Sequence, residues 1–223
     1  EVTLDHLEGY RGSRPVRIGN GASQHVQLDV FGEVVLAIDT LYTISGSIGD
    51  NAWQVVEHFA DVVCRDWRLK DQGVWEVRGE SQHFVYSKIM CWVALDRAVR
   101  LAGALGRNGS TQRWAITAAE IKAEVLERGW SEGKQSFVQR YDSETLDASN
   151  LMIPFVKFLP ASDPRVRSTV DAIMGELGDG PFVRRYDSEE TDDGIGEQEG
   201  SFTLVSFWLI GNLVGQGRIE LAK

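Results

Sequence analysis

Apolar residues recur at helical spacing through most of the chain, so the sequence predicts a mostly helical protein. The expected helices cover about residues 24–45, 50–68, 80–105, 111–128, 146–160, 163–178 and 199–213. We find no long strand pattern; only FVQRY (137–141) and FVRRY (182–186) are expected to be short extended pieces. The pattern therefore predicts the all-α class.

Each expected helix has one apolar face and polar residues that fit its ends. Asp163 followed by Pro164 predicts a cap and a first helical position. Ser23 and Asp50 are the expected caps of the first two helices. In the first helix, the apolar face is expected to be Val26, Val30, Val34, Ile38 and Leu41.

A short internal repeat divides the second half of the chain. Residues 137–144 read FVQRYDSE and residues 182–189 read FVRRYDSE. Each copy follows a glycine-containing loop and leads into an expected helix. This arrangement favours stacked helical hairpins with similar loops at one end, as in an α/α barrel. The alternative is that both copies are merely structural loops.

The composition narrows the class of partner. The net charge of −10 argues against nucleic acid or an anionic membrane as the partner and favours a neutral small molecule. No apolar run reaches membrane-spanning length and no secretory signal opens the chain, so the expected location is cytoplasmic. Cys64 and Cys91 are expected to be buried free thiols, and the four histidines lack the spacing of metal ligands.

The pair Trp75 and Glu76 is the first candidate for chemistry. It lies in a glycine-containing loop before the long apolar helix expected to end near Leu105. A carboxyl held by a helix beside an indole suits a general acid, because an apolar wall raises its pKa. The alternative is that Glu76 and Glu80 form the acidic first turn of that helix, which needs no chemistry.

Two further loops carry carboxylates. One contains Asp142, Glu144 and Asp147, and the other contains seven carboxylates between Asp187 and Glu199. If the hairpins close into a ring, these loops share a rim with Glu76, where two carboxylates can hydrolyse an acetal. Alternatives for the last loop are a solvated turn, a calcium site, or the magnesium site of a terpene-type enzyme.

Several stretches together resemble glycoside hydrolase family 15, the glucoamylase-like enzymes. They are SRPVRIGNGAS, QLDVFGEVV, GVWEVRGESQHFVYSKIMCWVALDRA, LDASNLMIPFVKFLP and GEQEGSFTLVSFWLI. The resemblance implies an (α/α)6 barrel that hydrolyses α-glucosidic bonds with inversion at the anomeric carbon. It also implies release of β-glucose from a chain end, without a cofactor or metal. Its substrate would be a starch-like oligosaccharide, an isomaltose-type glucoside or, as in a trehalase of the same family, trehalose.

The resemblance also implies roles for individual residues. Glu76 would be the general acid. The general base would be Glu199, with Glu197 as the alternate, because the loop reads GEQEG where the family has a Gly-Glu-Glu-Gly type stretch. The implied substrate-binding residues are Arg14, Arg17, Trp75, Arg185 and Tyr186.

The chain is short for such a barrel. Residues 1–223 are expected to be one partial catalytic domain that lacks the N-terminal helices and their sugar-gripping Arg-Asp pair. The open barrel would expose apolar helix faces, so we expect self-association and little activity from this chain alone. One rival interpretation is an inactive sugar-binding remnant. The other is a polysaccharide lyase on the same fold, which only Tyr186 and Arg185 support.

Overall fold

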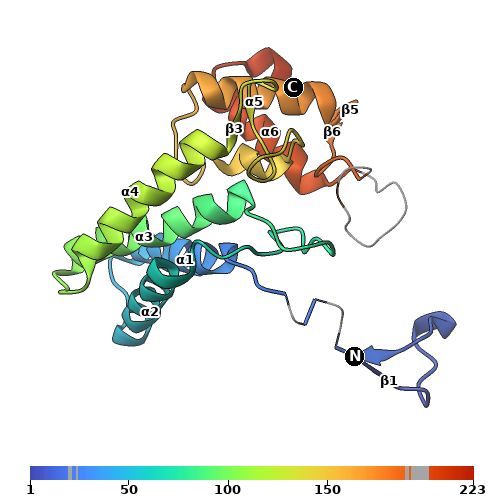
Figure 1. Cartoon of the computed structure of the whole chain (residues 1–223), viewed down its shortest axis with the longest axis horizontal. Helices are drawn as coiled ribbons and strands as arrows, with labels where there is room; N and C mark the ends of the chain where they lie inside the picture. The colour runs from blue at the N-terminus through green and yellow to red at the C-terminus, as the bar shows by residue number, and fades with distance from the viewer. Residues whose placement is uncertain (20–21, 24, 189–190, 192–200) are drawn as a thin grey trace.

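The structure, a computed structural model, describes residues 1–19, 22–23, 25–188, 191 and 201–223 (Figure 1). Within these residues most of the chain is helical, in agreement with the predicted all-α class. The helices are α1 (Asp29–Ser45), α2 (Asp50–Asp66), α3 (Val85–Leu105), α4 (Thr111–Arg128), α5 (Pro164–Glu176), α6 (Thr203–Gly215) and the 3-10 turns η1 (Tyr10–Gly12), η2 (Ala148–Met152) and η3 (Ile219–Ala222). The strands form three antiparallel pairs: β1 (Val2–Thr3) with β2 (Arg17–Ile18), β3 (Trp130–Ser131) with β4 (Ser136–Phe137), and β5 (Gly178–Asp179) with β6 (Phe182–Val183).

Helix α3 is the centre of the molecule. It contacts α1, α2, α4 and η2, and residues on all its sides are buried. Helix α1 approaches it closely at Gly32, where an added Cβ would lie 2.2 Å from the carbonyl oxygen of Met90. The N-terminal hairpin β1–β2 lies apart from these helices (Figure 1).

Short and long connections alternate along the chain. Residues 46–49 and 106–110 join α1 to α2 and α3 to α4 as short turns. Residues 67–84, 129–147 and 177–202 are the longer connections that return the chain to the next inner element. Contacts run from α1 to α3, from α3 to η2 and from η2 to α6, so these four elements form the inner row.

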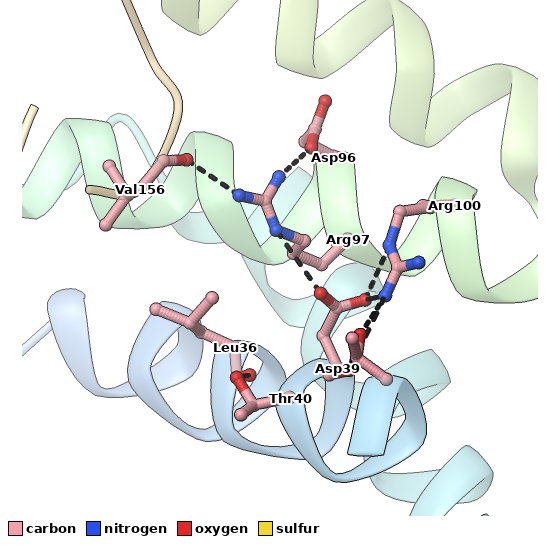
Figure 2. A network of polar contacts seen from close by, with 8 residues as sticks. Leu36, Asp39, Thr40, Asp96, Arg97, Arg100 and Val156 are labelled. Atoms are coloured by element: carbon pink, nitrogen blue, oxygen red, sulfur yellow. Dashed lines mark hydrogen bonds and ion pairs between the residues drawn. The ribbon is translucent and has the colours of Figure 1, made fainter. Parts of the chain in front are cut away.

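A partly buried ionic network joins two members of this row, α1 and α3, to the segment after η2 (Figure 2). The carboxylate of Asp39 in α1 accepts hydrogen bonds from Arg100 and lies 3.6 Å from Nε of Arg97, both in α3. Arg97 also donates to the carbonyl oxygen of Val156 at 2.7 Å and to Asp96. One carboxylate thus ties α3 to α1, and one guanidinium ties α3 to the segment after η2.

The first helix differs from its prediction in start and orientation. It begins at Asp29, and Ser23 does not cap it. The predicted apolar face is wrong for Val30, Val34 and Leu41, which are exposed, whereas Ile38 packs against the core as predicted. Gly32 and Val35 are the residues buried against α3. The helix presents its small residue to α3 because only a glycine permits such a close approach of two backbones.

Two other helices are shorter than predicted. The long helix starts at Val85, so the alternative that Glu76 and Glu80 form its first turn is wrong. The helix expected over 146–160 is only the 3-10 turn η2 followed by non-helical turns. Pro154 has no N–H to donate and Lys157 has a left-handed backbone (φ 61°), so a continuous α-helix ends there.

The repeat has a structural counterpart. Each copy begins with the second strand of a hairpin, β3–β4 or β5–β6, so the short extended pieces are confirmed at their first residues. The first copy pairs through Arg140 with Phe84, just before α3, and the second pairs through Tyr186 with Asp147, just before η2. Each copy therefore fastens a long connection to the one before it.

Both cysteines are free thiols, with Cys91 buried and Cys64 half-buried. Among the residues that the structure describes, no helix has both the length and the apolar character needed to cross a membrane.

Candidate active site

Trp75 and Glu76 lie in a tight turn before α3. The N–H of Glu76 donates to the carbonyl of Gly73 at 3.1 Å, and the N–H of Val77 donates to that of Gln72 at 3.0 Å. Glu76 is half-buried and its φ is 54°, a left-handed backbone that a glutamate rarely adopts. Strained backbone of this kind is concentrated at functional sites.

The indole of Trp75 is held by a buried carboxylate. Its Nε1 donates to both oxygens of Asp147, at 2.9 and 3.1 Å. Asp147 also accepts from the N–H of Ser149 at 2.7 Å and from Nε2 of Gln139 at 3.2 Å. Burial raises the pKa of Asp147, and these donors oppose that rise. Asp147 therefore positions Trp75.

An aromatic wall surrounds the same indole. The ring of Trp75 lies 6.2 Å from that of Tyr186, 6.0 Å from that of Phe202 and 6.5 Å from that of Trp208. The guanidinium of Arg185 lies 5.1 Å from the centroids of Trp75 and of Tyr186. The loop before α3, the second repeat copy and the start of α6 thus meet around one tryptophan, and together they form a surface suited to a sugar ring.

Carboxyl groups gather on the other side of the turn. Asp29 and Asp71 are buried, and the hydroxyl of Tyr86 donates to Glu33 at 2.6 Å. Burial, followed by the charge of Asp71, raises the pKa of Asp29 to about 7, and the charge of Glu76 contributes to this rise. The charge of Glu76 is thus felt by this acidic cluster, and its neighbour in the chain, Trp75, belongs to the aromatic wall.

Comparisons with known proteins identify the family. The family model for glycosyl hydrolases family 15 matches residues 1–222. The chain belongs to this family. It is 46% identical to a trehalase of Mycobacterium tuberculosis and 48% identical to one of Mycolicibacterium smegmatis, with the whole chain aligned to 33% of each relative. A trehalase of Thermoplasma volcanium is 40% identical, with 36% of it covered.

The family-15 chain thus spans about a third of the length of these relatives. Its fold is similar to that of a glycosidase variant in complex with glucose (TM-score 0.76, 19% identity), which covers 92% of this chain and 53% of its own. A wild-type glycosidase gives a TM-score of 0.75 at 21% identity, with the same coverage. The expected all-α fold, as part of an (α/α)6 barrel, is confirmed.

The structure of this family-15 chain brings some of the predicted site residues together. Trp75, Arg185 and Tyr186 are in mutual contact, and Glu76 follows directly on Trp75. The prediction that separate loops share one rim is supported for the turn before α3, for Asp147 and for the second repeat copy.

Other predicted residues lie elsewhere. Arg14 and Arg17 are exposed in the N-terminal hairpin, which lies apart from the helices (Figure 1), and Arg17 pairs with Glu1 at 3.1 Å. Glu197 and Glu199 fall outside the described residues, so the general base stays a prediction.

Sequence reasoning missed several residues of the site. Asp147 was grouped with the candidate acids, and Asp29, Asp71 and Trp208 were not singled out. An aspartate between apolar residues, as in the stretch QLDVFGE, was the available signal for Asp29, because an unpaired acid is rarely buried.

Proposed function

We propose that a protein containing this chain hydrolyses α-glucosidic bonds with inversion, and that trehalose is its substrate. The proposal is carried by the Trp75–Glu76 turn, in which a glutamate with a strained backbone directly follows the tryptophan of the aromatic wall. The trehalase relatives favour trehalose over the starch-like glucosides that the resemblance to glucoamylases implies.

The proposed reaction uses two carboxyl groups. Glu76 donates its proton to the glycosidic oxygen while the bond from that oxygen to the anomeric carbon breaks. Glu199, or Glu197 as the alternate, takes a proton from a water molecule that attacks the same carbon from the opposite face. From trehalose this gives one β-glucose and one α-glucose. Inversion needs room for the water, so we expect the two carboxyl groups about 6.5–9.5 Å apart.

The neighbours of Glu76 suit the role of an acid. The indole of Trp75 cannot swing away, because Asp147 accepts its N–H from within the protein. The sugar ring would stack on this wall, and its arrival would exclude water and strengthen electrostatic effects on the proton transfer. Arg185 and Tyr186 would contact the substrate from the second repeat copy.

The test compares trehalose, maltose and isomaltose as substrates for a protein of the full length of the relatives, with the anomers resolved by NMR. We expect trehalose to be the fastest substrate, and equal amounts of α-glucose and β-glucose to appear from it before mutarotation. The Glu76→Gln variant should lose about 10²–10⁴-fold in turnover. The control is Glu80→Gln, which neutralises an exposed carboxylate in the same loop and should retain activity.

Three outcomes would contradict the proposal in different parts. Full activity in Glu76→Gln would reject the acid. Early formation of two α-glucose molecules from trehalose would reject inversion. Faster release of glucose from maltose than from trehalose would favour the glucoamylase-like substrate class.

A further inference from the structure

A series of hydrogen bonds continues from Trp75 past Asp147 into the protein. Asp147 accepts from Nε2 of Gln139 at 3.2 Å, and Oε1 of Gln139 accepts from the hydroxyl of Thr191 at 3.3 Å. Gln139 and Thr191 are each 2% exposed, so bulk water does not compete for these groups. The proposed chemistry uses neither side chain.

The hydrogen-bonded series joins segments that are far apart in the sequence. Trp75 belongs to the long connection before α3, Gln139 and Asp147 belong to the one before η2, and Thr191 belongs to the one before α6. In the sequence, the last of these connections also carries both candidates for the general base. One series of side-chain contacts thus passes through all three long connections.

The direction of these hydrogen bonds is set by Asp147. A carboxylate has only acceptors, so the amide of Gln139 turns its NH2 group to Asp147 and its oxygen to Thr191. The threonine hydroxyl must then donate. The side chain at position 139 has to donate at one atom and accept at another. An ionised glutamate only accepts and an arginine only donates, so neither could replace this glutamine.

The internal repeat points to the same residue. Its two copies, FVQRYDSE and FVRRYDSE, differ at one position, where the first has Gln139 and the second has Arg184. Arg184 is half-buried and donates to the carbonyl of Glu176 at 2.8 Å. Both copies fasten one connection to another, so this shared role does not explain the difference. The contacts of Gln139 with Asp147 and Thr191 do explain it.

The backbone of Gln139 is held on both sides. Its N–H donates to the carbonyl of Thr145 at 2.8 Å, and its carbonyl accepts from the N–H of Val85, the first residue of α3, at 2.9 Å. With the backbone fixed, the amide group can move only through its side-chain torsions. Its contacts with Thr191 and Asp147 therefore determine where the amide lies.

We propose that Gln139 and Thr191 are positioning residues, which hold the indole of Trp75 through Asp147. The hydroxyl of Thr191 orients the amide of Gln139, the amide orients the carboxylate of Asp147, and the carboxylate holds the indole. Hydrogen bonds in such a series strengthen one another, because each polarises the next. That the indole carries a sugar rests on the proposed function, whereas the coupling of Thr191 to Trp75 does not.

The first test follows the indole N–H resonance of Trp75 by NMR in the 223-residue chain, with the assignment made from a Trp75→Phe variant. We expect Thr191→Val to shift this resonance, because the amide of Gln139 is then held at one end only. Thr191→Ser keeps a hydroxyl and should restore the wild-type position. Thr117→Val is the matched control, since it makes the same change in a buried threonine of α4, and it should leave the resonance in place.

A double-mutant comparison decides whether Thr191 acts through Gln139. Gln139→Met fills a similar space without an amide. In the Gln139→Met background, Thr191→Val should cause no further shift, because the series is already interrupted. A further shift as large as that in the wild-type background would show that Thr191 acts by another route, and would overturn the proposal. Thr191→Ala takes the place of Thr191→Val if the valine variant does not fold.

The second test measures activity in a protein of the full length of the relatives. Thr191→Val should lower kcat/KM for trehalose about fivefold, the factor that one neutral hydrogen bond provides. Thr191→Ser should recover most of this loss, and Thr117→Val should keep the wild-type value. An unchanged kcat/KM in Thr191→Val would overturn the role of these residues in the reaction.

Two NMR results would overturn the coupling itself: an unmoved resonance in Thr191→Val, or a shift that Thr191→Ser does not reverse. Neither readout depends on catalysis. A protein that shows the expected resonance changes but hydrolyses no glucoside would sink the proposed function and leave this inference standing. An active enzyme with an unmoved resonance would do the reverse.

Discussion

At the scale of single residues, Asp147 is almost enclosed, at 3% exposed, and its oxygens receive hydrogen bonds from an indole, a backbone N–H and an amide. Its neighbour in the same repeat loop, Asp142, is exposed and pairs with Arg128. The sequence shows two aspartates five positions apart, and nothing local distinguishes them. The difference arises because Trp75, far away along the chain, brings a donor to one of them.

We expect Asp147→Asn to lower the free energy of unfolding by about 2 kcal/mol, because an amide offers only one acceptor oxygen to donors that a carboxylate satisfies with two. Asp142→Asn should change it by less than about 0.5 kcal/mol, because exposed ion pairs contribute little. Urea unfolding measures both. In the same samples, the indole N–H resonance of Trp75 should shift only in Asp147→Asn. Equal effects on stability would contradict the buried role of Asp147.

At the scale of elements, the sequence predicts helices well where polar residues mark their ends. Helix α4 has the predicted bounds, and Asp163 with Pro164 starts α5 as expected. Helix α1 is harder, because it has apolar residues on two faces. Periodicity cannot decide which face packs, and Gly32, which decides it, counts as neither strongly apolar nor polar.

We expect Gly32→Ala to destabilise the fold by about 2 kcal/mol, because the new methyl group would meet the backbone of Met90 and push α1 from α3. Gly103→Ala is the matched control within α3. Nothing lies within 4 Å of its added Cβ, so alanine's better helix propensity should stabilise by about 0.5 kcal/mol. Thermal unfolding of the two variants gives the comparison. A neutral Gly32→Ala would mean that α1 does not rely on this close approach.

At the scale of the whole molecule, the inner row ends in two apolar surfaces. The α1 surface consists of Val30, Val34, Leu41 and Ile44, and the α6 surface consists of Leu204, Phe207, Ile210 and Val214, all of them exposed. Helical hairpins hide such faces against the next hairpin of a barrel. In the site, the turn before α3 and the meeting of separate loops at one rim were predictable from the sequence, whereas the hydrogen bond from Trp75 to Asp147 was not.

We propose that the chain self-associates through these two surfaces. Light scattering should show a mass that rises with protein concentration. Leu41→Lys combined with Phe207→Lys should suppress the rise, because each lysine places a charge on a residue that is 52% or 65% exposed. Ile116→Lys is the control, on a 53% exposed residue of α4 outside both surfaces. A constant monomer mass, or equal suppression by the control, would contradict this proposal.

The α1 and α6 surfaces lie at opposite ends of the inner row and differ in sequence. A contact between the α1 surface of one copy and the α6 surface of another leaves one of each unfilled, so it has no twofold symmetry. Association of this kind adds copies head to tail and stops only if the turn per copy closes a circle. The expected products are therefore a series of oligomers of increasing copy number, with no dominant dimer.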